Sequence, residues 1–199
     1  MISAALAVAL LCLLPLSRSA PLACEDLVRP SDGLTPRHLE GKWALVAGSL
    51  SHPPFLERFR QRDSASVNFA SSSGDTGASY TRSMRLRGNC TYSSYNITLE
   101  GSSFTYDGTD KSNVSAAFVR TSCRDCILMR MDRHSVDLYL LSRRREVEPR
   151  EMEEFRAQLK CYQLPAPVVT DPTKELCPEH PQSSPTAPKE TKVFLQWLK

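Results

Sequence analysis

Eight short segments in which apolar and polar residues alternate, separated by turn residues, constrain this chain more than any other feature. Successive side chains of a strand point to opposite faces, so these segments predict β-strands, and short turns join them as antiparallel neighbours. The predicted strands cover residues 43–49, 66–71, 78–86, 91–99, 102–106, 114–122, 126–131 and 136–142. Eight such strands can close into a barrel that holds one small ligand. An open sandwich is the alternative that the pattern leaves.

A helix after the last strand completes the predicted pattern. Glutamates crowd its start, Pro149 suits its first turn and Lys160 closes it, which is the charge order that a helix dipole favours. Met152, Phe155 and Leu159 form an apolar stripe along it. We expect the helix to pack outside the barrel, because residues 136–141 of the last strand are apolar on both faces.

The one long connection, residues 50–64, contains a short apolar group. Phe55, Leu56 and Phe59 fall on one face if this segment is helical. Such a helix would lie across the mouth of the barrel as a lid. A small hydrophobic cluster beneath a surface loop is the equal alternative.

Residues 1–19 predict a signal peptide. Their apolar run, residues 4–16, is too short to span a bilayer, and the small residues Ser17 and Ser19 suit signal peptidase. An uncleaved membrane anchor is the alternative. Residues 20–177 then form one predicted domain, and the proline-rich, polar residues 178–199 form a flexible tail. The apolar end of that tail, residues 193–198, is expected to dock on the barrel or to touch lipid.

The cysteines and glycosylation sequons predict a secreted protein. One of the seven cysteines lies in the leader, and the even number that remains predicts three disulfides. Asn96 and Asn113 stand in sequons, and so does Asn89, although a bridged Cys90 at the centre of its sequon would hinder modification. The formal net charge of +3 gives no reason to expect a nucleic-acid partner, and no segment after the leader is long enough for a stable membrane span.

The motif Gly41-Lys42-Trp43 opens the first strand, ahead of the meander and the single helix. This layout resembles the lipocalins, secreted barrels that carry small molecules. Residues 153–155 and 168–171 are similar to the alpha-1-acid glycoproteins, and residues 121–123 to apolipoprotein M; fish plasma lipocalins that bind saxitoxin, tetrodotoxin or tributyltin look like the nearest group. The resemblance implies an all-β, eight-stranded antiparallel up-and-down barrel with one C-terminal α-helix outside. It also implies transport in plasma of a hydrophobic or amphiphilic lipid, toxin or xenobiotic.

The resemblance further implies how the cysteines pair. It gives two bridges, Cys24 with Cys161 and Cys90 with Cys177. Cys123 and Cys126 remain for the third, which departs from apolipoprotein M, where the partner of the position equivalent to Cys123 lies in the helix region. A redox motif or half of a zinc site is the alternative for Cys123-x-x-Cys126, although the βαβ context and the second ligand pair are missing.

Gly41, Trp43 and Arg143 receive structural roles from the same resemblance. Lipocalins place a basic residue at the end of the last strand, close to the opening tryptophan. A cation–π contact between Arg143 and Trp43 is therefore implied at the closed end of the barrel.

The predicted cavity lining has two sources. A glycan cannot be attached to a side chain inside a barrel, so Asn96 outside turns Tyr95 and Ile97 inward. The same reasoning at Asn113 turns Phe118 and Arg120 inward. The resemblance adds six positions: Val46, Tyr80, Arg82, Met84, Asp137 and Tyr139. The predicted pocket is apolar and aromatic with a few charges, as small-molecule sites usually are.

The charges in this pocket distinguish two ligand classes. A free Asp137 would suit a cationic amphiphile, whereas an excess of arginine would suit an acidic lipid, and the count of two arginines to one aspartate leans to anions. Pairing of these side chains with one another is the alternative, since an unpaired buried charge is costly. Lipoprotein particles are a further possible partner, and neither a cofactor nor a metal is expected.

Two other functions compete with transport. An enzyme is disfavoured because none of the four histidines has metal or triad spacing, and a catalytic cavity thiol would need an unpaired cysteine. We therefore predict a protein that is not an enzyme. The other rival is an immunomodulatory or cell-surface-binding glycoprotein of the acute-phase type, whose cavity is incidental; a small molecule bound to protein from native fluid would argue against it.

Overall fold

A computed structural model describes residues 23–71, 76–108, 114–133 and 135–179. Its strands are β1 (Gly41–Leu50), β2 (Ser64–Ser71), β3 (Gly77–Leu86), β4 (Asn89–Glu100), β5 (Ser103–Tyr106), β6 (Ser115–Val119), β7 (Cys126–Asp132), β8 (Val136–Ser142) and β9 (Val168–Val169). Its helices are α2 (Cys24–Leu27), α3 (Pro36–Leu39), α4 (Pro53–Arg60) and α5 (Pro149–Cys161). All eight predicted strands are present, and β9, α2 and α3 are additions. The predicted signal peptide, Asn113 and residues 180–199 lie outside the described residues.

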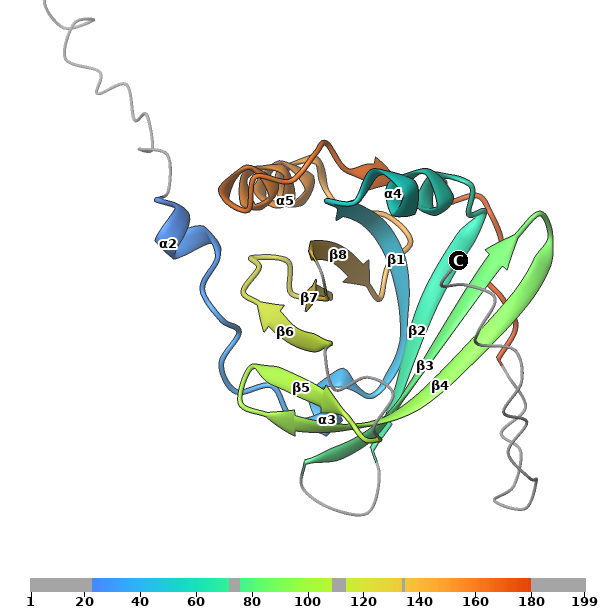
Figure 1. Cartoon of the computed structure of the whole chain (residues 1–199), viewed down its shortest axis with the longest axis horizontal. Coiled ribbons are helices and arrows are strands. Elements are labelled where there is room, and N and C mark those ends of the chain that lie inside the picture. The colour runs from blue at the N-terminus through green and yellow to red at the C-terminus, as the bar shows by residue number, and fades with distance from the viewer. Residues whose placement is uncertain (1–22, 72–75, 109–113, 134, 180–199) are drawn as a thin grey trace, which may run out of the picture.

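The sheet closes on itself. Each strand from β2 to β7 pairs antiparallel with the strand that follows it in sequence, and β1 pairs with both β8 and β2. Figure 1 shows the strands arranged as a ring with α5 outside it. The predicted up-and-down barrel is confirmed, and the open sandwich is wrong, because β1 supplies partners at both edges of the meander.

The two faces of β8 explain the position of α5. Tyr139 and Leu141 belong to the apolar cluster inside the barrel. Leu138 and Leu140 point the other way and pack in a second cluster with the stripe of α5, which consists of Met152, Phe155 and Leu159. A strand covered on both faces must be apolar on both, so the prediction of an outer helix is confirmed.

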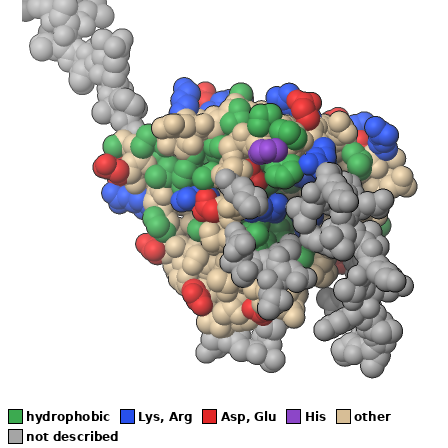
Figure 2. Space-filling model, viewed as in Figure 1, with side chains coloured by type: hydrophobic (Ala, Val, Ile, Leu, Met, Phe, Trp, Pro, Cys, Tyr) green, Lys and Arg blue, Asp and Glu red, His purple; other side chains and the backbone are tan. Residues whose placement is uncertain are grey.

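The connection between β1 and β2 folds as a helix that joins the barrel core. Leu56 and Phe59 of α4 are buried in the interior cluster, to which Phe55 also packs. Phe59 lies directly against Gly48 of β1, where an added Cβ atom would come within 2.5 Å of the Phe59 ring. Since β1 ends and β2 begins here, α4 lies at the open end of the barrel. Its buried Leu56 and Phe59 form the predicted apolar group, and none of the residues 53–60 lines the hollow, so the lid remains a prediction. Figure 2 shows hydrophobic and basic side chains mixed on the surface near α4.

The segment after α5 runs back across the outside of the barrel and covers a seam. Only residues 41–44 of β1 pair with β2, and further along the strand β9 takes that place by pairing with Ala47 and Gly48. The Thr170 hydroxyl donates to the carbonyl oxygen of Leu45 at 2.7 Å, and Cys177 is bonded to Cys90 on β4. We call residues 168–178 the strap. Among the described residues, none of the helices has the length and apolar character needed to cross a membrane.

Candidate ligand-binding cavity

A hollow lies inside the barrel near its open end. The space inside it that the centre of a water-sized molecule can occupy is about 40 Å³. Its apolar wall comes from strands on the β1 side of the barrel and is formed by Leu45, Ala65, Val67, Met129, Met131 and Leu141. Two tyrosines and three arginines supply most of its polar wall: Tyr80, Tyr139, Arg62, Arg82 and Arg133. An apolar wall with a few polar groups at one end suits an amphiphile.

Aromatic side chains fill the opposite side of the interior. Phe104 lies between Phe118 and Tyr106, with ring centroids 5.5 and 5.4 Å away. Tyr80 extends this packing to Phe69 at 5.3 Å, and Tyr95 lies 6.1 Å from Tyr80. This aromatic cluster occupies the part of the barrel near β3 to β6. The space left for a guest is therefore on the side of β1, β2, β7 and β8.

Three arginines gather at this hollow without a carboxylate partner. Arg62 precedes β2, Arg82 lies on β3 and Arg133 follows β7. Among the described residues, none of the three forms an ion pair. Burial lowers the pKa of Arg62; the charges of Arg82 and Arg133 lower it further, and Tyr139 opposes them. The charges of Arg82 and Arg133 therefore act on Arg62 across the hollow.

Asp137 lies beside Tyr139 on β8 and is 3 % exposed. The Tyr139 hydroxyl donates to Oδ2 of Asp137 at 3.3 Å, and Oδ1 has no hydrogen-bond partner within the described part of the chain. Burial raises the pKa of Asp137, an effect that the charge of Arg133 partly offsets. Asp137 is thus one buried acid beside three arginines, and it is not bonded to any of them.

The predicted lining residues fall into distinct groups. Tyr80, Arg82 and Tyr139 line the hollow. Tyr95, Ile97 and Phe118 face the interior as predicted, but they belong to its packed side. Met84, partly buried, continues the face of Arg82 toward the end of β3.

Two predicted lining residues are wrong. Val46 packs outside the barrel with Met152 and Phe155, because it lies on the face of β1 opposite Trp43 and Leu45, where a β-bulge interrupts the register. Arg120 is exposed, because β6 ends at Val119 and the alternation of the strand goes no further.

Arg62 and Arg133 are lining residues that the sequence analysis missed. Both lie in connections, where strand alternation assigns no direction to a side chain. The available signal was positional. Each stands close to a strand end at the open mouth, and a search for basic residues at those strand ends would have found them.

The closed end matches the structural roles that were implied. The Arg143 guanidinium lies 3.7 Å from the centroid of the Trp43 ring, and the indole N–H donates to the carbonyl oxygen of Leu39 at 2.6 Å. Nη1 of Arg143 also donates to the carbonyl oxygen of Lys42 at 3.0 Å. Gly41 has φ +94°, and a Cβ atom there would come within 2.8 Å of Arg143 Nη1. Only glycine leaves room for this arrangement.

The disulfides are those that the resemblance implied: Cys24–Cys161, Cys90–Cys177 and Cys123–Cys126. All six cysteines of the described residues are therefore bonded, and none of these offers a thiol for catalysis. The side chains of Asn89 and Asn96 are exposed on β4.

Comparison with known proteins agrees with this architecture. The family model for the ApoM domain, a lipocalin-family domain, matches residues 31–180. A solved structure of the siderocalin Ex-FABP, a protein with dual ligand specificities, matches with a TM-score of 0.62 and 14 % identity, covering 74 % of this chain and 99 % of that one. At this identity the second match shows the fold alone, and no curated protein sequence matches. Because the ApoM model spans most of the chain and the barrel is closed, the chain belongs to the ApoM-domain family of lipocalins.

Proposed function

We propose that this chain is a secreted glycoprotein that binds and transports a small amphiphile with an acidic head group. Membership of a lipocalin family supports the coarser part, a carrier of small hydrophobic ligands. In this proposal the apolar tail of the guest lies against Leu45, Met129 and Leu141, and its head lies at the mouth.

The observation that carries the acidic head group is the set of three arginines without an acidic partner. Arg62 and Arg82 are partly buried, whereas Arg133 is exposed. A guanidinium in a partly desolvated site is costly unless an anion pairs with it. Arg62, Arg82 and Arg133 converge on one hollow, so one carboxylate or phosphate could reach more than one of them. Asp137 does not favour a cationic guest, because the three arginines outnumber it, it is not among the residues that line the hollow, and it accepts a hydrogen bond from Tyr139.

A pair of matched probes tests this proposal. We expect a fluorescent fatty acid to bind more tightly than its methyl ester, which has the same tail without the charge. Replacing Arg82 or Arg133 by glutamine should weaken binding of the acid about tenfold, the size expected for loss of one charge-assisted contact, and leave the ester nearly unchanged. Arg37→Gln at the closed end is the control, since Arg37 is exposed on α3. Equal binding of acid and ester by the unaltered protein would contradict the acidic head group.

Secretion and glycosylation belong to the same proposal. Expression of the full chain in animal cells should release protein whose first residue is near Ala20, and enzymatic removal of N-glycans should convert Asn96 to aspartate. Asn113 is a second expected site, and Asn89 should be modified least because its sequon contains the bridged Cys90. Co-migration of the secreted protein with lipoproteins on a density gradient would identify lipoprotein particles as partners.

A further inference from the structure

The turn between β6 and β7, at the closed end of the barrel, contains a disulfide of short span. Cys123 and Cys126 are separated by 3 positions, whereas the other bridges span 137 and 87. A short closed loop restricts the unfolded chain least, so this bridge contributes the least loop-closure stabilisation of the three. Backbone hydrogen bonds also hold the turn, from Cys126 N to the Cys123 oxygen at 3.3 Å and from Arg143 N to the Asp125 oxygen at 2.8 Å. The barrel therefore does not need this bridge to keep the turn in place.

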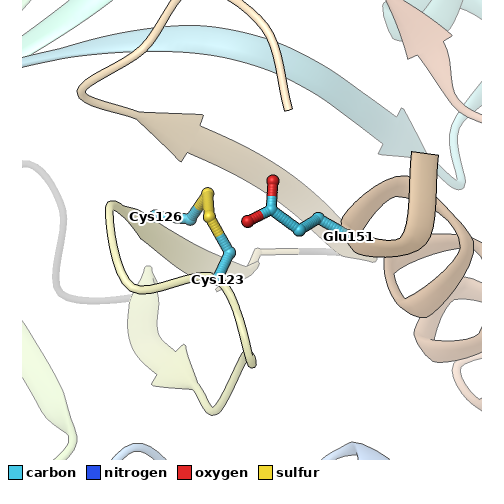
Figure 3. A group of neighbouring side chains, drawn as sticks. All are labelled: Cys123, Cys126 and Glu151. Carbon is cyan, nitrogen blue, oxygen red and sulfur yellow. A yellow bond between two sulfur atoms is a disulfide. The ribbon is translucent and has the colours of Figure 1, made fainter. Parts of the chain in front are cut away.

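An arginine and a glutamate face this disulfide. Nη2 of Arg144 donates to Sγ of Cys123 at 3.2 Å, and it lies 2.8 Å from each carboxylate oxygen of Glu151. Glu151, on the first turn of α5, has a side chain only 15 % exposed. Figure 3 shows its carboxylate directed at the bridge, and one of its oxygens and the two sulfurs all lie within 4.8 Å of one another. Glu151 therefore holds the guanidinium against the sulfur of Cys123.

We infer that Cys123–Cys126 is a redox-active disulfide that exchanges with an external dithiol. A guanidinium beside a cysteine favours the thiolate over the thiol, so Arg144 stabilises the reduced form and makes Cys123 the better leaving group. The carboxylates of Glu151 and Asp125, which pair with Arg144 at 2.8 and 3.5 Å, oppose this effect, but the guanidinium is the charged group bonded to the sulfur. Among the described residues, neither of the other two disulfides has a cationic side chain bonded to its sulfur. A metal does not explain the cluster, because bonded sulfurs offer no thiolate and Arg144 already occupies the Glu151 carboxylate.

The exchange proceeds in two balanced steps. A thiolate of the dithiol attacks Sγ of Cys126, and the electron pair of the broken S–S bond leaves with Cys123 as a thiolate beside Arg144. The second thiolate of the dithiol then attacks the first dithiol sulfur, which is bonded to Cys126 in the mixed disulfide, and Cys126 leaves. Two electrons pass to the protein pair and the dithiol becomes a disulfide. Of the two protons that the dithiol loses, one goes to Cys126 and the other to solvent, because Cys123 stays a thiolate. Cys123 and Cys126 are 3 % and 7 % exposed, so access to Cys126 requires local opening of the turn between β6 and β7, while Arg144 stays beside Cys123.

Limited reduction of the intact protein tests the order in which the bridges open. Full-length protein is incubated with increasing dithiothreitol, blocked with N-ethylmaleimide and analysed by peptide mass spectrometry. We expect labelling of Cys123 and Cys126 at a dithiothreitol concentration about tenfold lower than labelling of the other four cysteines, because the guanidinium of Arg144 makes Cys123 the better leaving group. Simultaneous opening of all three bridges, or later opening of this one, would overturn the inference.

The role of Arg144 is tested by the reactivity of the reduced pair. Replacement of Arg144 by glutamine should raise the pH midpoint for alkylation of Cys123 by iodoacetamide and slow the reaction at neutral pH about tenfold, whereas lysine should restore part of the rate. Arg156→Gln is the control, an exposed arginine of α5 that does not touch the bridge. An unchanged midpoint in the glutamine variant would overturn the role of Arg144. Since the bridge lies at the closed end, failure of ligand binding would leave these results unaffected.

Discussion

The arginines at the two ends of the barrel differ in their interaction partners. At the closed end Arg143 lies over Trp43 and donates to backbone oxygens, so the chain itself satisfies the charge. At the open end Arg62, Arg82 and Arg133 line a hollow without an acidic partner among the described residues, and of the three only Arg62 has a ring contact there, 4.7 Å from the centroid of Phe59. Partnered polar groups stabilise a fold, whereas unpartnered ones cost stability and leave capacity for binding. The comparison separates residues that build the barrel from residues proposed to bind its guest.

Removal of the Trp43 side chain should have the largest effect. Trp43 is buried and holds both Leu39 and Arg143, so Trp43→Ala should lower the free energy of unfolding by about 3–5 kcal/mol, as large-to-small core changes do. Chemical denaturation measures the loss, and Trp43→Phe, which keeps a ring without the indole N–H, should lose less. The ratio of acid to ester binding should not change. A change in that ratio would contradict the separation between a closed end that stabilises the fold and an open end that binds the ligand.

The contact between Gly48 and Phe59 offers a smaller change at the open end. Gly48→Ala should displace the ring of Phe59 and lower the free energy of unfolding by about 1–3 kcal/mol, the usual cost of overpacking. Release of a bound probe should also become faster, since α4 lies at the open end of the barrel. Phe59→Leu should relieve the clash, so the double variant should lose less than the sum of the single losses. Strict additivity would show that this contact does not position α4.

The smallest expected effect concerns Asp137 and has a defined pH dependence. Burial raises the pKa of Asp137 in the folded state, so folding favours the protonated form, and this contribution to stability is lost as the pH rises through the raised pKa. Asp137→Asn should therefore stabilise the protein by about 1 kcal/mol at neutral pH, with a gain that shrinks on acidification. Thermal unfolding at several pH values measures this, with the exposed Asp107→Asn as control. A gain independent of pH would mean that the Asp137 charge is not its cause.

Local patterns predicted most of the fold. Alternation identified all eight barrel strands, and the apolar stripe of Met152, Phe155 and Leu159 identified the face by which α5 packs. These features depend on neighbours within one element, so the sequence carries them directly. The disulfide pairs came instead from the resemblance, because spacing alone does not fix connectivity.

The cavity was predicted less completely, because it depends on register and on connections. Val46 was misplaced since the side of β1 that meets α5 is set by pairing and by a bulge that composition does not reveal. Arg62 and Arg133 were missed since a side chain in a connection has no periodicity to follow. Tyr80, Arg82 and Tyr139 came from the resemblance, and these positions transfer because each lies within a regular strand.

The strap over the seam between β1 and β2 has a consequence for how a guest enters and leaves. Parting the barrel along that seam would require release of β9 and of the Thr170 hydrogen bond, while the Cys90–Cys177 bond keeps the far end of the strap attached. Local opening follows the route that breaks the fewest contacts. Movement of α4, whose Phe59 packs against Gly48, breaks fewer contacts than parting the strands. We therefore expect the strap to keep the seam closed and a guest to pass at the open end, beside α4.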